Sequence, residues 1–411
     1  MFYEHQKSDF ISAVSGVENV VKAAFPIRSR QYELTASNWR WLNLGDAYIN
    51  DVAKQKQAKL KEQTYAARLV ADFELKSIAD GKTVDSLKNY YVLDFPHLTR
   101  LGGYIVGGKD RQIVRQMRLR PGLYSTVAPD GTVRTMINTS AAGTYKVLLD
   151  RASGMCRLAL SHTNIPIYSA LRAVGATDAE IKAVLGPELF AINVREASVA
   201  DDTHKMFVKL RPYESIPADL DEQRKIITKF MASKPLDAQV NAITTGQNGI
   251  DKIDKRALLA ATDKAIRLSK GSVDEDDTES LAFKSIHGID DFILEKYKRS
   301  LPTLVRYVQQ ALNKTIKSGK RPEIKFVMPP HVFSSPIESF FGTLELSRYS
   351  EQNNLVDIAA TSDLITPMGE GGIKSIHAVT DDVRAFHPTY LGAIDPLETP
   401  EGQGIGLTNH L

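Results

Sequence analysis

The most constraining feature of the chain is a stretch rich in glycine and proline between residues 337 and 411. Gly369, Gly371 and Gly372 lie within four positions, and glycines alternate at 402, 404 and 406 after prolines at 396 and 400. Glycine adopts positive φ and carries no Cβ, so such segments let backbone N–H groups approach a ligand closely. Proline interrupts helices and inner strands. The pattern predicts an irregular backbone that a partner completes, and we expect another polypeptide to continue the fold after Leu411.

Composition is that of a globular chain. Its 411 residues are 25% charged and 43% hydrophobic, which is ordinary, and suffice for about two or three domain cores. The net charge of +3 does not by itself indicate nucleic-acid binding. The single cysteine, Cys156, excludes intrachain disulfides and thiolate zinc clusters and fits a reducing compartment. The sequence shows neither a membrane-spanning apolar run nor a signal peptide, so we expect a cytosolic protein.

Periodicity predicts mixed helices and strands before residue 125. Residues 38–64 predict a helix, with Trp39, Trp41 and Leu42 at its start and lysines towards its end. Residues 64–75 alternate as a strand does. Residues 104–106 and 113–119 predict the two strands of a hairpin, joined through residues 107–110 with the sequence Gly-Gly-Lys-Asp.

Helix signals are clearest after residue 160. Residues 164–175 have helical periodicity, and Gly175 can close that helix. Thr177 and Glu180 are spaced as a capping box for the next helix. A long helix is expected to follow Pro302, because proline suits the first turn of a helix.

The last seventy residues carry two long ordered motifs. FFGTLELSRYSEQNN at 340–354 fits the pattern F-F-G-x-x-x-L-S-x-[FY]-x-[DE]-Q-N-N, and residues 387–407 fit H-P-T-x-x-G-x-x-x-P-x-E-T-P-E-G-x-x-I-G-L. Both resemble the fork region of the β subunit of multisubunit DNA-dependent RNA polymerases. A G-x-G-G segment between them, here Gly369 to Gly372, completes the resemblance.

Two further segments are similar to other parts of β. Residues 96–124 resemble its protrusion, and residues 164–175 and 208–212 resemble its lobe. The resemblance implies an α+β, multidomain chain of mixed helices and antiparallel strands. The implied domains are a first part of the protrusion at 1–149, the lobe at 150–250, a second part of the protrusion at 251–335, and a fork at 336–411 that another chain continues.

The predicted hairpin is basic, with six lysines and arginines and one aspartate between Arg100 and Arg120. Such a strip can contact nucleic-acid phosphates. It can equally be a solvated sheet face or pair with a partner subunit. The candidates for DNA-phosphate contacts are Arg111, Arg115, Arg118 and Arg120.

The resemblance implies which residues lie near nucleic acid. Those expected to face the RNA–DNA hybrid are Arg348, Glu351, Gln352, Asn353, Asn354, Glu398, Glu401, Gly402 and Gly404. A loop that separates the downstream strands is expected at Gly369, Glu370, Gly371, Gly372 and Lys374. No catalytic residue is expected on this chain, because the family's magnesium-binding aspartates belong to β′ and its β lysines near the nucleotide follow the segment matched here.

Metal sites of the chain's own are not expected. The acidic run Asp274-Glu275-Asp276-Asp277 lacks the glycine and the glutamate spacing of an EF-hand, and polar runs are usually solvated loops. The histidines form no HxxH or HExxH pair. The implied cofactor is Mg²⁺ for the assembled enzyme, bound by other subunits.

Departures from the family pattern indicate which kind of organism or virus encodes the chain. Thr361, Ser362, Asp363 and Leu364 stand where bacterial enzymes carry a basic His-Lys-Arg-Arg run. Such divergence fits the split β subunits of large bacteriophages, with a split archaeal subunit or a fragment of a cellular β as alternatives. The expected location is the cytoplasm of the infected bacterial host, with packaging in the virion left open.

The implied partners are a C-terminal β fragment, β′ fragments, a promoter-specificity subunit, template DNA and nascent RNA, with no membrane. The competing hypothesis is a non-catalytic, β-like module that binds nucleic acid or the host polymerase.

Overall fold

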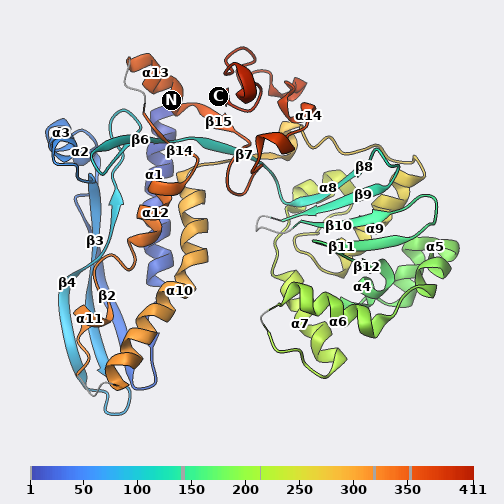
Figure 1. The fold of residues 1–411 in the computed structure, drawn as a ribbon, viewed down its shortest axis with the longest axis horizontal. Coiled ribbons are helices and arrows are strands. Elements are labelled where there is room, and N and C mark those ends of the chain that lie inside the picture. Colours follow the sequence, from blue (N-terminus) through green and yellow to red (C-terminus); the bar gives the residue numbers. More distant parts are fainter. Residues whose placement is uncertain (1, 140–143, 213, 318–320, 351–353) are drawn as a thin grey trace. The chain divides into compact units, whose positions relative to one another are not determined.

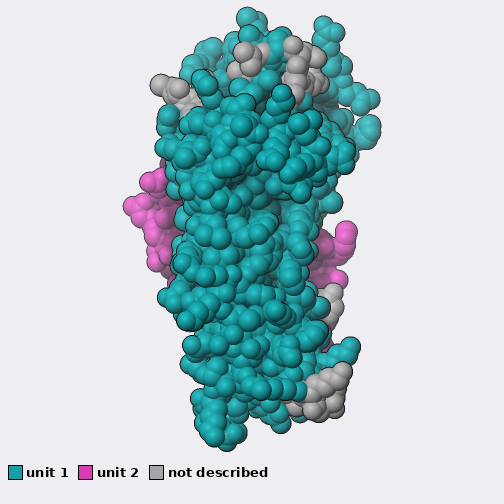
Figure 2. Space-filling view, turned by 90° about the vertical axis from the view of Figure 1, so that its left-hand side faces the viewer, with its two compact units in different colours: residues 1–117, 286–386, 390–411 teal, residues 118–285, 387–389 magenta. Residues whose placement is uncertain are grey.

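The computed structural model describes residues 2–139, 144–212, 214–317, 321–350 and 354–411. These form two compact units (Figures 1 and 2). Unit 1 comprises residues 1–117, 286–386 and 390–411, and unit 2 comprises residues 118–285 and 387–389. Segments of unit 1 that are far apart in sequence make one continuous surface in Figure 2. None of the described helices is both long enough and apolar enough to cross a bilayer.

Unit 1 is built on a four-stranded antiparallel sheet against two long helices. The sheet has the order β1-β2-β3-β4 and the helices are α1 and α10 (Figure 1). Leu69, Ala71, Phe73 and Leu75 alternate along β3 and are fully buried, so one face of the sheet forms the core. The bounds are α1 Phe2–Lys22, β1 Ile27–Arg28, β2 Tyr32–Leu42, α2 Asp46–Ile49, α3 Val52–Leu60, β3 Ala66–Ser77, β4 Thr83–Pro96 and α10 Ile289–Lys317.

Shorter elements complete unit 1. A three-stranded sheet has the order β14-β6-β5, and β15 lies between β7 and β16 in another sheet. The bounds are β5 Tyr104–Val106, β6 Lys109–Ile113, β7 Arg115–Leu119, α11 Ile324–Val327, α12 Ser335–Thr343, β14 Ser347–Tyr349, α13 Leu355–Ser362, β15 Leu364–Thr366, α14 Asp381–Arg384 and β16 Asn409–His410.

Unit 2 combines a five-stranded antiparallel sheet, of order β12-β11-β10-β9-β8, with the α-helices α4 to α9. One hydrophobic core runs from Leu123 in β8 to Leu268 in α9. The bounds are β8 Gly122–Val127, β9 Val133–Asn138, β10 Tyr145–Leu149, β11 Cys156–Leu160, β12 Thr163–Pro166, α4 Ile167–Ala173, α5 Asp178–Arg195, α6 Val199–Leu210, α7 Leu220–Ala232, α8 Ala238–Thr245 and α9 Lys255–Ser269, followed by β13 Lys284–His287 at the return to unit 1.

These elements confirm the α+β class and several local predictions. The strand predicted at 64–75 is β3. Gly107 and Gly108, with φ of 56° and 75°, form the two-residue turn between β5 and β6, but the predicted second strand of this hairpin, at 113–119, is wrong, because the strand that pairs with β5 is β6 at Lys109–Ile113. Arg115–Leu119 form β7, which pairs with β15 in another sheet. The capping box is present, since Thr177 Oγ1 accepts from the N–H of Glu180 and the Glu180 carboxylate accepts from the N–H of Thr177.

The prediction of a helix over 38–64 is wrong at its start. Residues 32–42 form β2 because Trp39 packs against Phe25 and Phe73, at ring distances of 5.7 and 6.2 Å, and the indole of Trp41 donates to Glu18. Helical structure appears only afterwards, in α2 and α3. Tertiary packing of the two tryptophans decides for a strand.

Two other helices begin elsewhere than predicted. Residues 163–166 pair with β11, so the helix expected at 164 begins at Ile167. α10 begins at Ile289 and contains Pro302, which is exposed. Water can solvate the carbonyl that a proline N–H would have bonded, which reduces the cost of proline inside a helix.

The compact units divide the chain at other places than the implied domains. The expected boundaries at 149/150 and 250/251 fall inside the core of unit 2, which needs β8, β9 and α9. The division lies instead between Met117 and Arg118 and between Ser285 and Ile286. The assignment of protrusion, lobe and fork to particular residues stays a prediction.

Candidate nucleic-acid interface

Within unit 1, the motif that begins at Phe340 packs against the basic hairpin formed by β5 and β6. Phe340 and Phe341 are buried in α12 with their rings 5.1 Å apart, and Phe341 packs 5.2 Å from Tyr104. This anchor directs the chain into β14, which pairs antiparallel with β6, Arg348 opposite Gln112. The apolar half of the motif thus places its polar half beside the hairpin.

This pairing creates a small basic and aromatic surface, which we call the hairpin cluster: Lys109, Arg111 and Tyr349. Tyr349 is 57% exposed. The Arg111 guanidinium lies 4.5 Å from the Tyr349 ring centre and donates to its hydroxyl at 3.1 Å, and Lys109 Nζ lies 5.6 Å from the ring. Arg348 is also exposed, but as the neighbour of Tyr349 in β14 it lies on the other face of the strand. Cations around an accessible ring suit both phosphates and stacked bases.

The glycine-rich loop is closed on itself. Gly369 N–H donates to Ile373 at 3.0 Å, and Gly372 N–H donates to Gly369 at 3.1 Å. Gln116 of β7 donates to the Met368 carbonyl at 2.7 Å. A Cβ on Gly372 would lie 2.3 Å from the Pro367 carbonyl oxygen, so only glycine fits there.

A second contact ties this loop to α10. Glu370, at the exposed tip, pairs with Arg299, whose hydrogen bond is the main reason that the pKa of Glu370 lies below its ordinary value. A hollow of about 280 Å³ lies between the loop and α10, lined by Lys296, Thr343, Leu344, Glu345, Gly369, Glu370 and Lys374. The loop is therefore held at its base by β7 and at its tip by a surface ion pair.

The end of the fork motif has a structural role at Asn354. Its side-chain oxygen accepts from the Asp357 N–H at 2.8 Å and caps α13. Glu351, Gln352 and Asn353 lie outside the described residues.

The last segment docks on β15. Thr366 Oγ1 donates to the Leu407 carbonyl at 2.6 Å, and Ile365 pairs with Asn409. Arg384 donates to the carbonyls of residues 403 and 405, both at 2.9 Å. Glu398 and Glu401 are exposed, Gly402 has a φ of 79°, and Gly402 to Gly404 form a single 3₁₀ turn. This segment thus has intrachain anchors of its own.

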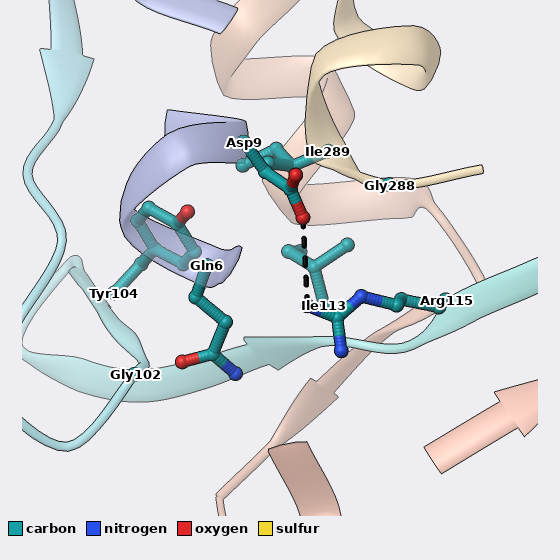
Figure 3. A pocket seen from close by; sticks show the side chains of 8 residues that line it. All are labelled: Gln6, Asp9, Gly102, Tyr104, Ile113, Arg115, Gly288 and Ile289. Atoms are coloured by element: carbon teal, nitrogen blue, oxygen red, sulfur yellow. Dashed lines mark hydrogen bonds and ion pairs between the residues drawn. The ribbon is translucent and has the colours of Figure 1, made fainter. Parts of the chain in front are cut away.

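Two of the four predicted phosphate-binding arginines, Arg115 and Arg120, pair with carboxylates of the protein. Arg115 is 9% exposed, its guanidinium lies 3.5 Å from the Asp9 carboxylate, and it donates to the Ser362 carbonyl at 3.3 Å. Figure 3 shows it beside Asp9 in a small cavity that Ile113 and Ile289 also line. Arg120, in unit 2, pairs with Asp237 at 2.5 Å. Arg118 is half-buried in β7. Arg115 is a poor phosphate candidate, because moving it would leave Asp9 without its counter-ion.

The acidic run at residues 274–277 makes hydrogen bonds and ion pairs within unit 2. Asp276 accepts from the Ser125 N–H at 2.6 Å and pairs with Lys264, which is 2% exposed. Glu275 accepts from the Val127 N–H at 3.0 Å, and Asp277 lies 2.7 Å from His387. Over the described part of the chain, no group of three acidic, histidine or cysteine residues could hold a metal ion.

Comparisons with known proteins show which family this chain resembles. A family described as RNA polymerase Rpb2, domain 3, matches residues 348–411. The chain is 23% identical to the DNA-directed RNA polymerase subunit beta of Corynebacterium jeikeium, over 98% of this chain and 36% of that protein. It is 24% identical to the subunit beta of Thermosynechococcus vestitus, over 86% of this chain and 33% of that protein.

The chain is homologous to the N-terminal region of the bacterial RNA polymerase β subunit. It spans about a third of the length of these relatives.

Two features of this region were not predicted from the sequence. The contact of Arg111 and Lys109 with Tyr349 joins residues more than two hundred positions apart. Lys296 and Arg299 reach the glycine loop from α10. Their basic run, KYKR at 296–299, is visible in the sequence but lies before the predicted start of that helix at Pro302.

Proposed function

We propose that this chain is the N-terminal part of a divided β subunit in a DNA-directed RNA polymerase. The observation that carries the proposal is homology to β over 98% of the chain, together with the family match at residues 348–411. The assembled enzyme would catalyse template-directed nucleotidyl transfer. Its other members would be a C-terminal β fragment, β′ fragments and a promoter-specificity subunit.

In this proposal the chain shapes the nucleic-acid path and supplies no catalytic acid. Lys109 and Arg111 of the hairpin cluster offer positive charge to the backbone of the RNA–DNA hybrid, and Tyr349 offers an exposed ring. The exposed Arg348 offers a further charge from the other face of β14. The loop from Gly369 to Gly372 is suited to stand between separating strands because Gln116 holds its base and Arg299 holds its tip. Mg²⁺ would be bound by β′ aspartates, where it would stabilise the charge that develops on the transferred phosphate.

We also propose a large bacteriophage as the source, acting in the cytoplasm of the infected host or carried in the virion. Support comes from an identity near 24% to the cellular subunits and from the loss of the basic run at Thr361 to Leu364. The second candidate function is a non-catalytic, β-like module that binds nucleic acid or the host polymerase.

Reconstitution tests the proposal. The full chain is co-purified with the gene products that carry the C-terminal part of β and the β′ aspartate motif, and primed RNA synthesis is measured with Mg²⁺ on a template scaffold. We expect synthesis from the complete set, and none when this chain is omitted or assayed alone. A complete set that stays inactive, while the chain binds host polymerase, would favour the non-catalytic module.

A further inference from the structure

The outer side of α10 has an unusual charge. Residues 295–314 contain five lysines and arginines and a single acidic residue, Glu295. Lys298, Arg299, Arg306 and Lys314 are exposed, whereas the opposite side, with Tyr297, Val308 and Leu312, is buried against unit 1. The sequence thus separates a core side from a basic side along one helix.

The cations follow the axis of the helix. Seven positions separate Arg299 from Arg306, and eight separate Arg306 from Lys314. At 3.6 residues per turn, these spacings place the three side chains on one side of the helix. A rise of 1.5 Å per residue separates them by about 10 and 12 Å. Such a row extends over several phosphates of a nucleic-acid strand, whose charges repeat every few ångströms.

Most of this charge is not neutralised within the chain. Arg299 pairs with Glu370, but Lys298, Arg306 and Lys314 have no ion-pair partner among the described residues. A polyanion lying along the helix would therefore be favoured by charge and by release of its counterions.

The same side of α10 carries an exposed aromatic side chain, and its N-terminal end lies beside the glycine-rich loop. Tyr307 is 49% exposed and lies seven positions before Lys314, on the same side of the helix. At the N-terminal end of the row, Lys296 lines the hollow beside the glycine loop, together with Lys374. The basic side of α10 therefore begins at the loop that the proposed function places between separating strands.

We infer that the outer side of α10 binds a single strand of nucleic acid, with Arg306 and Lys314 contacting its phosphates and Tyr307 stacking on a base. The inference rests on the proposed function for the direction of the strand, from the glycine loop along α10. That a strand binds here at all is inferred from the charge of α10 and from the exposed Tyr307 ring. The site differs from the arginines that the sequence predicted, since Arg115 and Arg120 bind carboxylates of the protein.

The test uses the full chain and a labelled DNA strand of about 20 nucleotides, with binding followed by fluorescence anisotropy between about 50 and 200 mM salt. Replacing Arg306 and Lys314 together with alanine should reduce the magnitude of the salt slope by about 1.4, at about 0.7 per lost single-strand contact. Tyr307→Ala should weaken binding about tenfold with little change in the slope, and Tyr307→Phe should retain it.

Two controls make the outcome decisive. Lys225→Ala with Lys229→Ala removes the same charge from exposed positions of α7 in unit 2 and should leave the slope unchanged. Polyglutamate of matched charge should compete poorly, because it offers no base to Tyr307. Equal effects of the two double variants, displacement by polyglutamate as effective as by DNA, or no effect of Tyr307→Ala would each overturn the inference. Primed RNA synthesis by the reconstituted enzyme would still test the proposed function separately.

Discussion

Gly372 shows how one side chain can decide the shape of a candidate site. Its missing Cβ leaves room for the Pro367 carbonyl and for the Gln116 amide, 2.3 and 2.6 Å from where a Cβ would stand. We expect Gly372→Ala to open the turn, at a cost of about 1–3 kcal/mol. Native-state hydrogen exchange of the Gly369 and Ile373 amides, both bonded within the turn, should accelerate.

The matched control for this prediction is Gly342→Ala. Gly342 lies in α12 with open space around its Cβ position, so alanine should be neutral or stabilise by up to about 1 kcal/mol. Unchanged exchange at Gly369 in the Gly372→Ala variant would contradict the predicted role of this glycine.

Cys156 is a reporter placed in the core of unit 2. It is fully buried in β11, and burial raises the pKa of its thiol to about 12. Since the thiolate is the reactive form, a disulfide reagent should modify native protein at least about a thousandfold more slowly than protein in urea. Rapid modification without denaturant would mean that unit 2 opens readily.

At the scale of the element, the acidic run fixes a loop to a sheet. The Asp276 carboxylate accepts a hydrogen bond from the Ser125 N–H and forms an ion pair with the buried Lys264. Asp276→Ala should destabilise unit 2 by about 3–5 kcal/mol, because Lys264 would remain buried without its partner. Urea unfolding followed by Cys156 reactivity measures the loss.

Two comparisons separate this role from metal binding. Asp274→Ala, at an exposed position of the same run, should leave the stability of unit 2 unchanged within about 0.5 kcal/mol. Added Ca²⁺ should shift neither variant. A calcium-dependent gain in stability that is lost with Asp276 would show that the run binds metal after all.

Glu180, at the start of α5, predicts that the stability of this helix depends on pH. The Thr177 N–H first, and Lys255 next, lower the pKa of Glu180 to about 2. Because the folded pKa lies below the unfolded value, near 4.3, this contribution is complete above about pH 5 and is lost as the pH falls towards 2. Glu180→Gln should flatten the corresponding part of the pH profile of α5 protection in hydrogen exchange, and an unaltered profile would argue against it.

At the scale of the whole molecule, the division into units predicts which fragment folds. Residues 118–285 contain all of the core from Leu123 to Leu268. Expressed alone, this fragment should unfold cooperatively and protect Cys156. The fragment 150–250 should not, because it lacks β8, β9 and α9, which carry much of that core. A folded 150–250 fragment would instead favour the domain boundaries implied by the sequence.

The sequence by itself determined the features that depend on neighbours along the chain or on long ordered motifs. The capping box at Thr177 is made within four residues, the turn at Gly107 within two, and β3 follows an alternating pattern. The motifs at 340–354 and 387–407 were sufficient to indicate the β family.

Only the tertiary structure decided which charges are available and where elements begin. Trp39 lies in a strand because of Phe73, Arg115 is neutralised by Asp9, and Glu370 is held by Arg299 on α10. Each of these partners is more than thirty positions away in sequence. An arginine in a motif looks the same whether it faces phosphate or a carboxylate, because the energy that separates the two cases comes from burial and pairing, which exist only after the chain has folded.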